Sequence, residues 1–250
     1  MLSGTKDGNE IIRLLKREGY KVLASAVTGY GASLAGEAGS DELFTGALNI
    51  QEMTDLIETR GINAVVDATH PFAVNASLNA MTACKKADMG YIRYERGLVT
   101  VPDNPLIYRV KDFKEASKKA VESGETIFYT AGSKNLRIFS ELARKKGRRI
   151  VVRVMSDPLI VKKCIELGIS PGDIVTMQGK SSKKLNTRLM KEFGADVLVT
   201  KDSGEAGGTG EKISAALDLG VPVILIERPE IEYSKVTQDF EEILRFLASG

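Results

Sequence analysis

Residues 64–73 read Ala-Val-Val-Asp-Ala-Thr-His-Pro-Phe-Ala and include His70, the only histidine of the chain. The short apolar run before Asp67 predicts a buried strand. A long helical pattern follows from Val74 to Ala87, and Pro71 is expected to open it, because proline fits the first turn of a helix. Asp67, Thr69 and His70 therefore lie on a strand-to-helix turn. In an open α/β sheet such turns lie at the carboxyl edge, where ligands bind.

The same construction recurs along the whole chain. Apolar runs that predict strands alternate with amphipathic segments that predict helices, which favours parallel sheets joined by crossover helices. Residues 97–105 contain two prolines and a glycine and have no periodicity, so this stretch is the best candidate for a domain boundary. We therefore expect an α/β protein with two doubly wound domains, residues 1–98 and 99–250.

The start of the chain departs from this pattern. A turn, Ser3-Gly4-Thr5, follows directly after Met1 and Leu2. A strand should precede the turn, but only two apolar residues are available for it. Either the strand is very short or the natural chain begins a few residues earlier, and the second alternative is the one we favour.

Composition excludes several classes of protein. The chain has 250 residues, of which 43% are hydrophobic and 27% charged, as in ordinary soluble globular proteins. A net charge of +2 gives no support for nucleic-acid binding. Cys84 and Cys164 fall in helical patterns without motif spacing, and with a single histidine we expect no disulfide and no metal site. Without a membrane-spanning run or a signal-peptide pattern, we expect a cytoplasmic protein.

Four predicted strand ends carry small or polar residues that suit a ligand. Glycines let the backbone approach a ligand closely, and the helix N-termini behind them offer free N–H groups to phosphate or carboxylate. Each turn alone could be a plain connection, but four on one kind of edge predict a ligand cleft. These turns are Ser3-Gly4-Thr5, Asp67-Ala68-Thr69-His70, Thr130-Ala131-Gly132-Ser133 and residues 200–210.

Several polar residues allow both a structural and a functional interpretation. His70 and Asp67 could each cap a turn or helix, and Arg93 and Arg96 could be solvated. Arg153 lies inside an apolar run and should face a partner or ligand rather than a dry core. A basic cluster at a predicted helix start indicates either an anionic partner or a solvated face: Lys180, Lys183 and Lys184.

Two classes of function fit these features. One is an oxidoreductase or transferase with a nucleotide cofactor, and the other is a small-molecule binding or regulatory module without chemistry.

The motifs themselves narrow this choice. Residues 67–73, Asp-Ala-Thr-His-Pro-Phe-Ala, resemble the signature of the precorrin-6A reductase family of cobalamin biosynthesis. The similarity continues in the same order over nearly the whole chain. It includes residues 91–96, 130–134, 199–204, 211–213, 215–216 and 227–229.

This resemblance implies two Rossmann-like domains with mainly parallel sheets and an active-site cleft between them. It implies an oxidoreductase acting on a CH–CH group, which reduces precorrin-6A or its cobalt form to precorrin-6B with NADPH or NADH. The substrate is a tetrapyrrole with many carboxylate side chains. We expect neither a nucleic-acid nor a membrane partner, and a monomer or small homo-oligomer.

The resemblance also implies roles for individual residues. A proton must reach the carbon next to the hydride acceptor, and His70, Asp67 or a bound water could supply it. The residues expected to bind the cofactor are Ser3, Gly4, Thr5, Thr28, Thr69, Thr130, Gly132 and Ser133. The residues expected to bind substrate carboxylates or cofactor phosphates are Arg93, Arg96, Lys134, Arg153, Lys201, Ser203 and Gly204.

Two stretches depart from the family pattern: residues 179–184, where Lys183 or Lys184 replaces a frequent acidic residue, and the first turn, where Ser3 replaces the second glycine. Residues 179–182 read Gly-Lys-Ser-Ser in place of the usual Gly-Pro-Phe-Ser, which keeps open the alternative of a tetrapyrrole-binding homologue without reductase activity. Thr28-Gly29-Tyr30 offers no cation for a 2′-phosphate, which favours NADH or a loose preference and the cobalt-containing, oxygen-independent branch.

Overall fold

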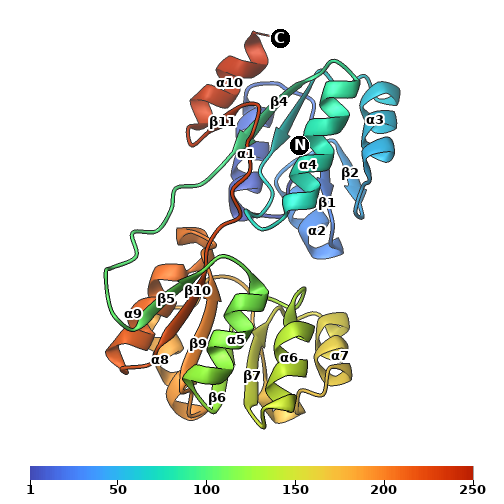
Figure 1. Cartoon of the computed structure of the whole chain (residues 1–250). Helices are drawn as coiled ribbons and strands as arrows, with labels where there is room; N and C mark the ends of the chain where they lie inside the picture. The colour runs from blue at the N-terminus through green and yellow to red at the C-terminus, as the bar shows by residue number, and fades with distance from the viewer. Residues whose placement is uncertain (250) are drawn as a thin grey trace. The chain divides into compact units, whose positions relative to one another are not determined.

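The computed structural model describes residues 1–249 as two compact units. The first unit contains Met1–Gly97 together with the segment that begins at Pro229, and the second is Leu98–Arg228. All strand pairs in both units are parallel, as predicted for the α/β class (Figure 1). The second unit differs from the expected range 99–250 because the chain leaves it at Arg228.

The sheet of the first unit is built around a single residue near the N-terminus. Leu2 bridges β1 and β3, and its N–H and C=O bond to Val66 and Ala68 at 2.8 and 2.9 Å. In the described residues the strand before the first turn is this one bridging residue, and an earlier natural start stays a prediction. The spatial order is β2, β1, Leu2, β3, β4, β11. The strands are β1 (Leu23–Ala26), β2 (Glu42–Thr45), β3 (Ala64–Asp67), β4 (Gly90–Tyr94) and β11 (Val236–Thr237).

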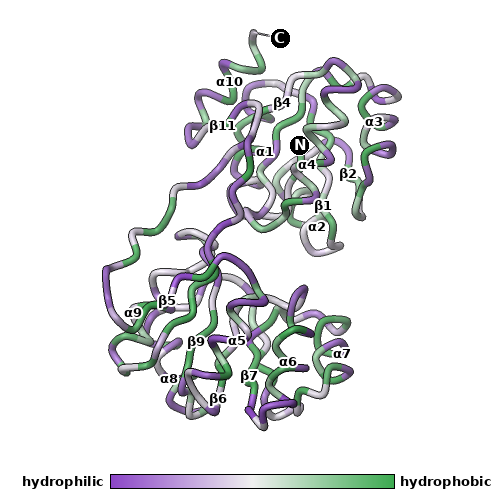
Figure 2. Tube along the Cα trace, viewed as in Figure 1, coloured by the Kyte–Doolittle hydropathy of each residue, from purple (hydrophilic) through white to green (hydrophobic). Residues whose placement is uncertain are grey.

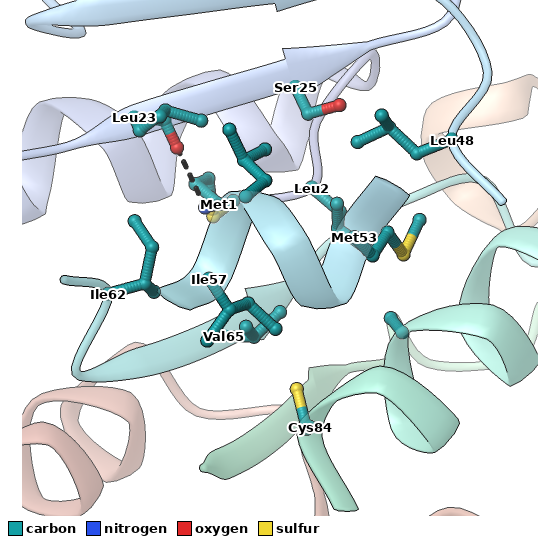
Figure 3. Close-up of a pocket in the computed structure, with 12 residues that line it drawn as sticks. Met1, Leu2, Leu23, Ser25, Leu48, Met53, Ile57, Ile62, Val65 and Cys84 are labelled. Atoms are coloured by element: carbon teal, nitrogen blue, oxygen red, sulfur yellow. Dashed lines mark hydrogen bonds between the residues drawn. The ribbon is translucent and has the colours of Figure 1, made fainter. Parts of the chain in front are cut away.

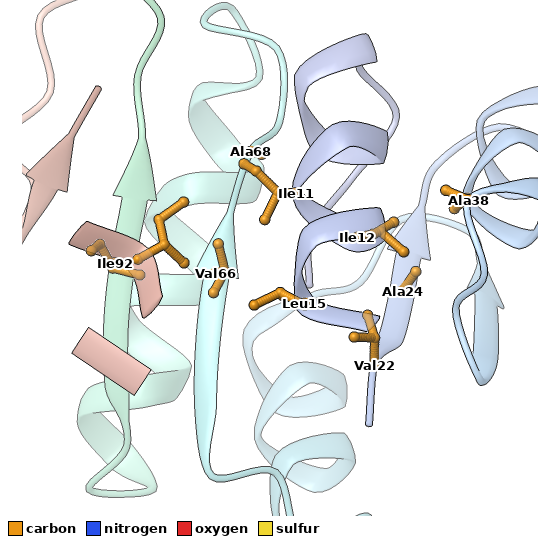
Figure 4. Packing of buried hydrophobic residues seen from close by; sticks show 11 residues of the cluster. Ile11, Ile12, Leu15, Val22, Ala24, Ala38, Val66, Ala68 and Ile92 are labelled. Atoms are coloured by element: carbon orange, nitrogen blue, oxygen red, sulfur yellow. The ribbon is translucent and has the colours of Figure 1, made fainter. Parts of the chain in front are cut away.

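Helices cover both faces of this sheet. Contacts join α1 with α2 and α3 with α4, one pair on each face. Apolar side chains of α1, including Ile11 and Leu15, pack against Val66 and Ile92 of neighbouring strands (Figure 4). The helices are α1 (Lys6–Arg17), α2 (Gly29–Glu37), α3 (Ile50–Thr59), α4 (Val74–Lys86) and α10 (Phe240–Ala248).

The helix after the 64–73 stretch begins at Val74, as its helical pattern predicts, but Pro71 is not part of its first turn. Pro71 lies in a separate turn, closed by the bond from the Ala73 N–H to the His70 C=O at 2.7 Å. The N-cap residue of helix α4, Ala73, provides no side-chain bond. The residues between Asp67 and Val74 therefore form a loop rather than a direct strand-to-helix turn.

The last segment of the chain joins the first unit for an observable reason. The β11 region adds an edge to β4, because the N–H groups of Arg93 and Glu95 donate to the C=O groups of Lys235 and Thr237, both at 2.9 Å. Ile243 of α10 is fully buried in the same hydrophobic cluster as α1. Because of these bonds and this burial, the last segment packs with the first unit. Residues 99–250 were expected to form one domain, so this expectation differs from the structure.

The second unit has a six-stranded sheet in the order β5, β10, β9, β6, β7, β8. Its central strands are strongly hydrophobic, and β9 appears green in Figure 2. Here the outer strand β5 precedes the other five in the chain, whereas in the first unit the outer strand β11 follows the other strands. The strands are β5 (Ile107–Val110), β6 (Thr126–Tyr129), β7 (Arg149–Val154), β8 (Ile174–Thr176), β9 (Val197–Lys201) and β10 (Val223–Ile226).

The helices of the second unit also form contacting pairs, α5 with α6 and α8 with α9. Phe128, Val151 and Leu198 point to the face covered by α8 and α9, where Met190 and Ile213 complete the cluster. The helices are α5 (Phe113–Ser123), α6 (Leu136–Lys145), α7 (Pro158–Glu166), α8 (Lys183–Glu192) and α9 (Thr209–Asp218), with short 3₁₀ turns at Pro171–Asp173 and Glu205–Gly207.

Two further expectations concern cysteines and membrane segments. Cys84 lies in α4 and Cys164 in α7, in helices as predicted, and both are buried free cysteines. Within residues 1–249, no helix is both long and apolar enough to cross a membrane.

Candidate functional site

The first candidate turn lies where the strand order of the first unit reverses, between Leu2 and β3. Thr5 caps α1 by accepting from the Gly8 N–H at 3.0 Å, and its hydroxyl donates to the Ala68 C=O at 2.8 Å. This bond ties the turn to the 64–73 stretch. Gly4 has φ +103°, and a Cβ there would meet no atom within 4 Å. The turn therefore leaves exposed backbone in front of the N-terminus of α1, where phosphate groups bind well.

Gly8 is a site residue that the sequence analysis missed. A Cβ at this position would lie 2.7 Å from Oγ and 3.3 Å from Cα of Ser3. The first turn of α1 can pass this close to the Ser3 backbone only because residue 8 lacks a side chain. The position of Gly8, five residues after Ser3, is the feature of the sequence that could have indicated this role.

Asp67 is the centre of a buried hydrogen-bond network. Its side chain is 0% exposed, and Oδ2 accepts from the hydroxyls of Ser77 at 2.6 Å and Tyr91 at 2.7 Å. Oδ1 accepts from the N–H of Thr69 at 2.9 Å and from its hydroxyl at 2.8 Å. The carboxylate thus fixes the start of the loop that leads to His70. Ser77 and Tyr91 were not singled out from the sequence, since each lies in an ordinary helix or strand pattern.

Arg93 completes this network from the neighbouring strand. Asp67 and Arg93 are register partners in β3 and β4, and Nη1 lies 2.8 Å from Oδ1 of Asp67. Nη1 and Nη2 also donate to the hydroxyl and C=O of Thr69, and Nε donates to Glu95 at 2.9 Å. The arginine is 1% exposed. All three nitrogens are engaged internally, so this geometry does not fit the expected contact with substrate carboxylates.

The electrostatics of the pair define the charge of Asp67. Burial opposes ionisation, but the Arg93 charge and the bonds from Ser77, Thr69 and Tyr91 outweigh it and lower the Asp67 pKa. For Arg93, burial is likewise outweighed by Asp67 and Glu95, and its pKa is raised. Asp67 is therefore ionised at neutral pH. A buried, ionised carboxylate with five hydrogen-bond donors does not fit the expected role of a proton donor.

His70 lies on the loop that this network holds. Its Nδ1 accepts from the N–H of Phe72 at 3.1 Å. In the neutral imidazole the proton is therefore on Nε2, which can donate. The ring is half-buried and packs against Phe72 at a centroid distance of 5.8 Å. The expected role of His70 as a proton donor stays a prediction.

Two other expected residues of the first unit have different surroundings. Arg96 pairs with Asp7 in the first turn of α1 at 2.6 Å, and both side chains are mostly buried. This places a guanidinium beside the Ser3-Gly4-Thr5 turn. Thr28 caps α2 by accepting from the Gly31 N–H at 3.1 Å and is exposed at the end of β1.

In the second unit the strand order reverses between β6 and β9. Thr130 follows β6 and donates its hydroxyl to the Val199 C=O at 3.0 Å, so that hydroxyl is already engaged. Gly132 has φ +84°, and its nearest neighbour is Nζ of Lys201, 3.9 Å from the position of a Cβ. Burial and the nearby charge of Lys134 lower the pKa of Lys201 to about 8. Ser133 is half-buried and Lys134 exposed in the same turn.

The loop from Lys201 to Thr209 is held by its own backbone. The N–H of Ser203 donates to the Thr209 hydroxyl at 3.1 Å, and the N–H of Gly204 donates to Oδ1 of Asp202 at 3.1 Å. Gly204 has φ +74°. Ser203 and Gly204 are both buried, so their expected contact with substrate would require their backbone rather than exposed side chains.

The basic residues beyond this loop have separate environments. Arg153 donates from Nη1 to Ser181 at 2.7 Å and to Asn186 at 2.6 Å, which are the partners its position in an apolar run required. Lys180 pairs with Glu211 at 2.6 Å, and Lys183 with Asp218 at 2.7 Å. These pairs lie at the surface, where carboxylates of α9 offset the basic cluster at the start of α8.

A hollow in the first unit has a different character from these turns (Figure 3). Its walls are almost entirely apolar, and burial raises the pKa of the Cys84 thiol there to about 11. It contains none of the expected site residues, and its lining offers little to an anion. The lining residues are Met1, Leu2, Leu23, Ser25, Leu48, Met53, Leu56, Ile57, Ile62, Val65, Ala80 and Cys84.

Two doubly wound parallel sheets, each with glycine-containing turns where its strand order reverses, define an α/β protein of the Rossmann-like class. The sequence profile of the family Precorrin-6x reductase CbiJ/CobK matches residues 1–248. The chain therefore belongs to this family, as its motifs suggested.

Individual proteins that are similar to this chain agree with this family. Proteins named cobalt-precorrin-6A reductase from Methanocaldococcus jannaschii and Priestia megaterium are each 37% identical to this chain over 250 and 251 residues. In each case the similarity covers 100% of this chain and 97% of the relative. The solved structure of CobK precorrin-6A reductase has the same fold, with a TM-score of 0.81 at 24% identity, over 99% of this chain and 95% of that one.

Proposed function

We propose that this protein reduces a precorrin-6A-type tetrapyrrole with a nicotinamide nucleotide, as a step of cobalamin biosynthesis. The observation that carries the proposal is the family match over residues 1–248. The relatives at 37% identity are named for the cobalt form of the substrate, which favours the cobalt-containing branch. The expected active-site cleft between the domains stays a prediction.

The first turn fits a nicotinamide nucleotide. Gly4 with φ +103° and Gly8 packed against Ser3 leave backbone N–H groups at the start of a 12-residue helix, as a pyrophosphate requires. Ser3, Gly4 and Thr5 would hold the cofactor there, and Thr28 would lie near its adenosine ribose. When bound, the nicotinamide supplies a hydride to the macrocycle.

The distribution of positive charge in the first unit bears on the choice between NADH and NADPH. Residues 22–59 form β1, α2, β2 and α3, the side of the sheet that would receive the adenosine half, and they contain no lysine or arginine. A 2′-phosphate would have no cation there. This favours NADH, or a loose preference, over strict dependence on NADPH.

In this proposal the proton comes from His70. Its Nε2–H is the donor, because Nδ1 is occupied by the Phe72 N–H. Asp67 and Arg93 act as positioning residues: their network holds Thr69, one residue before His70. Hydride transfer needs mainly alignment of the reacting carbons, and a fixed loop contributes to that alignment.

Incubation of the purified protein with cobalt-precorrin-6A and NADH or NADPH, without oxygen, tests the proposal. We expect nicotinamide oxidation that depends on the tetrapyrrole. Tetrapyrrole binding without oxidation of either nucleotide would instead support the alternative of a binding homologue without activity.

A further inference from the structure

Three polar side chains of the second unit converge on one face of the sheet at its carboxyl edge. Arg153 follows Val151 by two residues on β7, and Thr200 follows Leu198 by two residues on β9. Side chains two residues apart in a strand point to the same face. Arg153 and Thr200 therefore point toward α8 and α9, and the bonds of Arg153 to Ser181 and Asn186 agree with this.

Lys212 reaches the same region from α9. It shares the buried side of this helix with Thr209, Ile213 and Ala216, and is only 4% exposed. Within residues 1–249 its ammonium group forms no hydrogen bond or ion pair. The charged groups that act on it are Arg153, Lys201, Glu211 and Asp202. Of the two carboxylates, Glu211 is already paired with Lys180, and Asp202 accepts from the Gly204 N–H.

The partners of the other two side chains are also incomplete. The Thr200 side chain is fully buried, and its hydroxyl has no hydrogen-bond partner in the part of the chain that the structure describes. Arg153 uses only Nη1 for its two bonds, and both acceptors are neutral. Over the described residues, its Nε and Nη2 have no protein acceptor. A buried hydroxyl without a partner, as at Thr200, is costly unless a ligand supplies the missing acceptor, and the half-buried Arg153 has donors left for the same ligand.

We infer that Arg153, Thr200 and Lys212 form a binding site for one anionic oxygen group, a carboxylate or a phosphate. The Nε–Nη2 edge of a guanidinium matches two oxygens of such a group, and the lysine and hydroxyl can donate to others. The inference rests on the proposed function only for the source of the group, which is a substrate carboxylate or a cofactor phosphate.

Electrostatics agree with this geometry. Burial, followed by the charges of Arg153 and Lys201, lowers the Lys212 pKa to about 7. Burial alone lowers that of Arg153. A bound anion would stabilise the charged form of Lys212 and raise its pKa.

Inorganic phosphate is the first probe, because its binding requires no reductase activity. The pKa of Lys212 is measured by NMR on ¹³C-lysine protein, with and without phosphate at matched ionic strength. We expect an increase of about one unit or more in phosphate. We also expect phosphate to raise the melting temperature of the wild type but not of Lys212→Met.

Two variants make the result interpretable. Lys212→Met keeps the length and burial of the side chain, so it should fold. Lys191→Met removes one exposed charge from α8 and should respond to phosphate like the wild type. An unchanged Lys212 pKa in phosphate, or an equal response of Lys212→Met and Lys191→Met, would overturn the inference.

A second pair of measurements identifies the source of the anionic group. If it is a cofactor phosphate, Lys212→Met weakens nicotinamide nucleotide binding by about tenfold or more; if it is a substrate carboxylate, only tetrapyrrole binding weakens to that extent. Loss of neither would overturn a role in ligand binding. A protein that binds phosphate through Lys212 but fails to oxidise nicotinamide would refute the proposed function and leave the site intact.

Discussion

Replacement of Arg93 by methionine tests whether the Asp67 network is structural. The substitution removes the 2.8 Å contact with Asp67, two bonds to Thr69 and one to Glu95. It leaves the Asp67 carboxylate 0% exposed without its countercharge. Breaking a buried ion pair in this way costs about 3–5 kcal/mol. That is a large part of the roughly 5–15 kcal/mol that stabilises an ordinary domain.

Urea unfolding of the first unit measures this loss. Hydrogen exchange read by mass spectrometry follows peptides of this unit separately, since two units need not unfold together. A loss of about 4 kcal/mol lowers the urea midpoint by roughly 2 M, for an m value of about 2 kcal/mol/M.

A matched control removes a different ion pair of the same unit. Arg60 contacts Glu42 at 3.0 Å, but both side chains are more than half exposed. Arg60→Met should cost less than about 1 kcal/mol. Adding Asp67→Asn to Arg93→Met should cost much less than the sum of the single variants, because no buried charge then remains unpaired. Equal, small losses for Arg93→Met and Arg60→Met would refute a structural role for Arg93.

Four further outcomes are expected. The wild-type first unit should lose stability below about pH 4, because the pKa of Asp67 is lowered in the folded state and the ionised carboxylate stops contributing to stability as it protonates. In urea titrations at several pH values, Asp67→Asn should lack this contribution. His70→Ala should lower kcat/KM by about 100-fold or more, and a change within threefold would remove His70 from proton transfer. Gly8→Ala should weaken nicotinamide nucleotide binding in calorimetric titrations, whereas Gly29→Ala, where a Cβ meets nothing within 4 Å, should not. Thr28→Arg should tighten NADPH binding relative to NADH, and an unchanged ratio would contradict the proposed place of the ribose.

The alternation of strands and helices was predictable because apolar runs and helical periods are local signals. The 64–73 stretch shows the limit of such signals. Its strand and its polar turn follow from the sequence, but the pairing of Asp67 with Arg93 depends on the register of β3 with β4, which only the assembled sheet defines. Arg93 was therefore expected to face substrate, whereas it is engaged in the core.

Long-range pairing also explains the other differences. The single residue Leu2 occupies a strand position because it pairs with β1 on one side and β3 on the other. The sequence has no apolar run there that would predict a strand. The place of β11 beside β4 is equally invisible in the local pattern. Lys212 is a different case: its helical spacing with Ile213 and Ala216 puts it on the buried side, so periodicity could have revealed it.

Deuterium transfer from the nicotinamide is the decisive test of whether this protein reduces the tetrapyrrole. The purified protein is incubated without oxygen with cobalt-precorrin-6A and NADH or NADPH that carries deuterium at C4, in separate samples for the two faces of the ring. If the protein is the proposed reductase, one of these samples yields a reduced tetrapyrrole containing the deuterium and one proton from solvent. A reduced product without deuterium from either face, or a bound tetrapyrrole that is never reduced, would contradict the proposal.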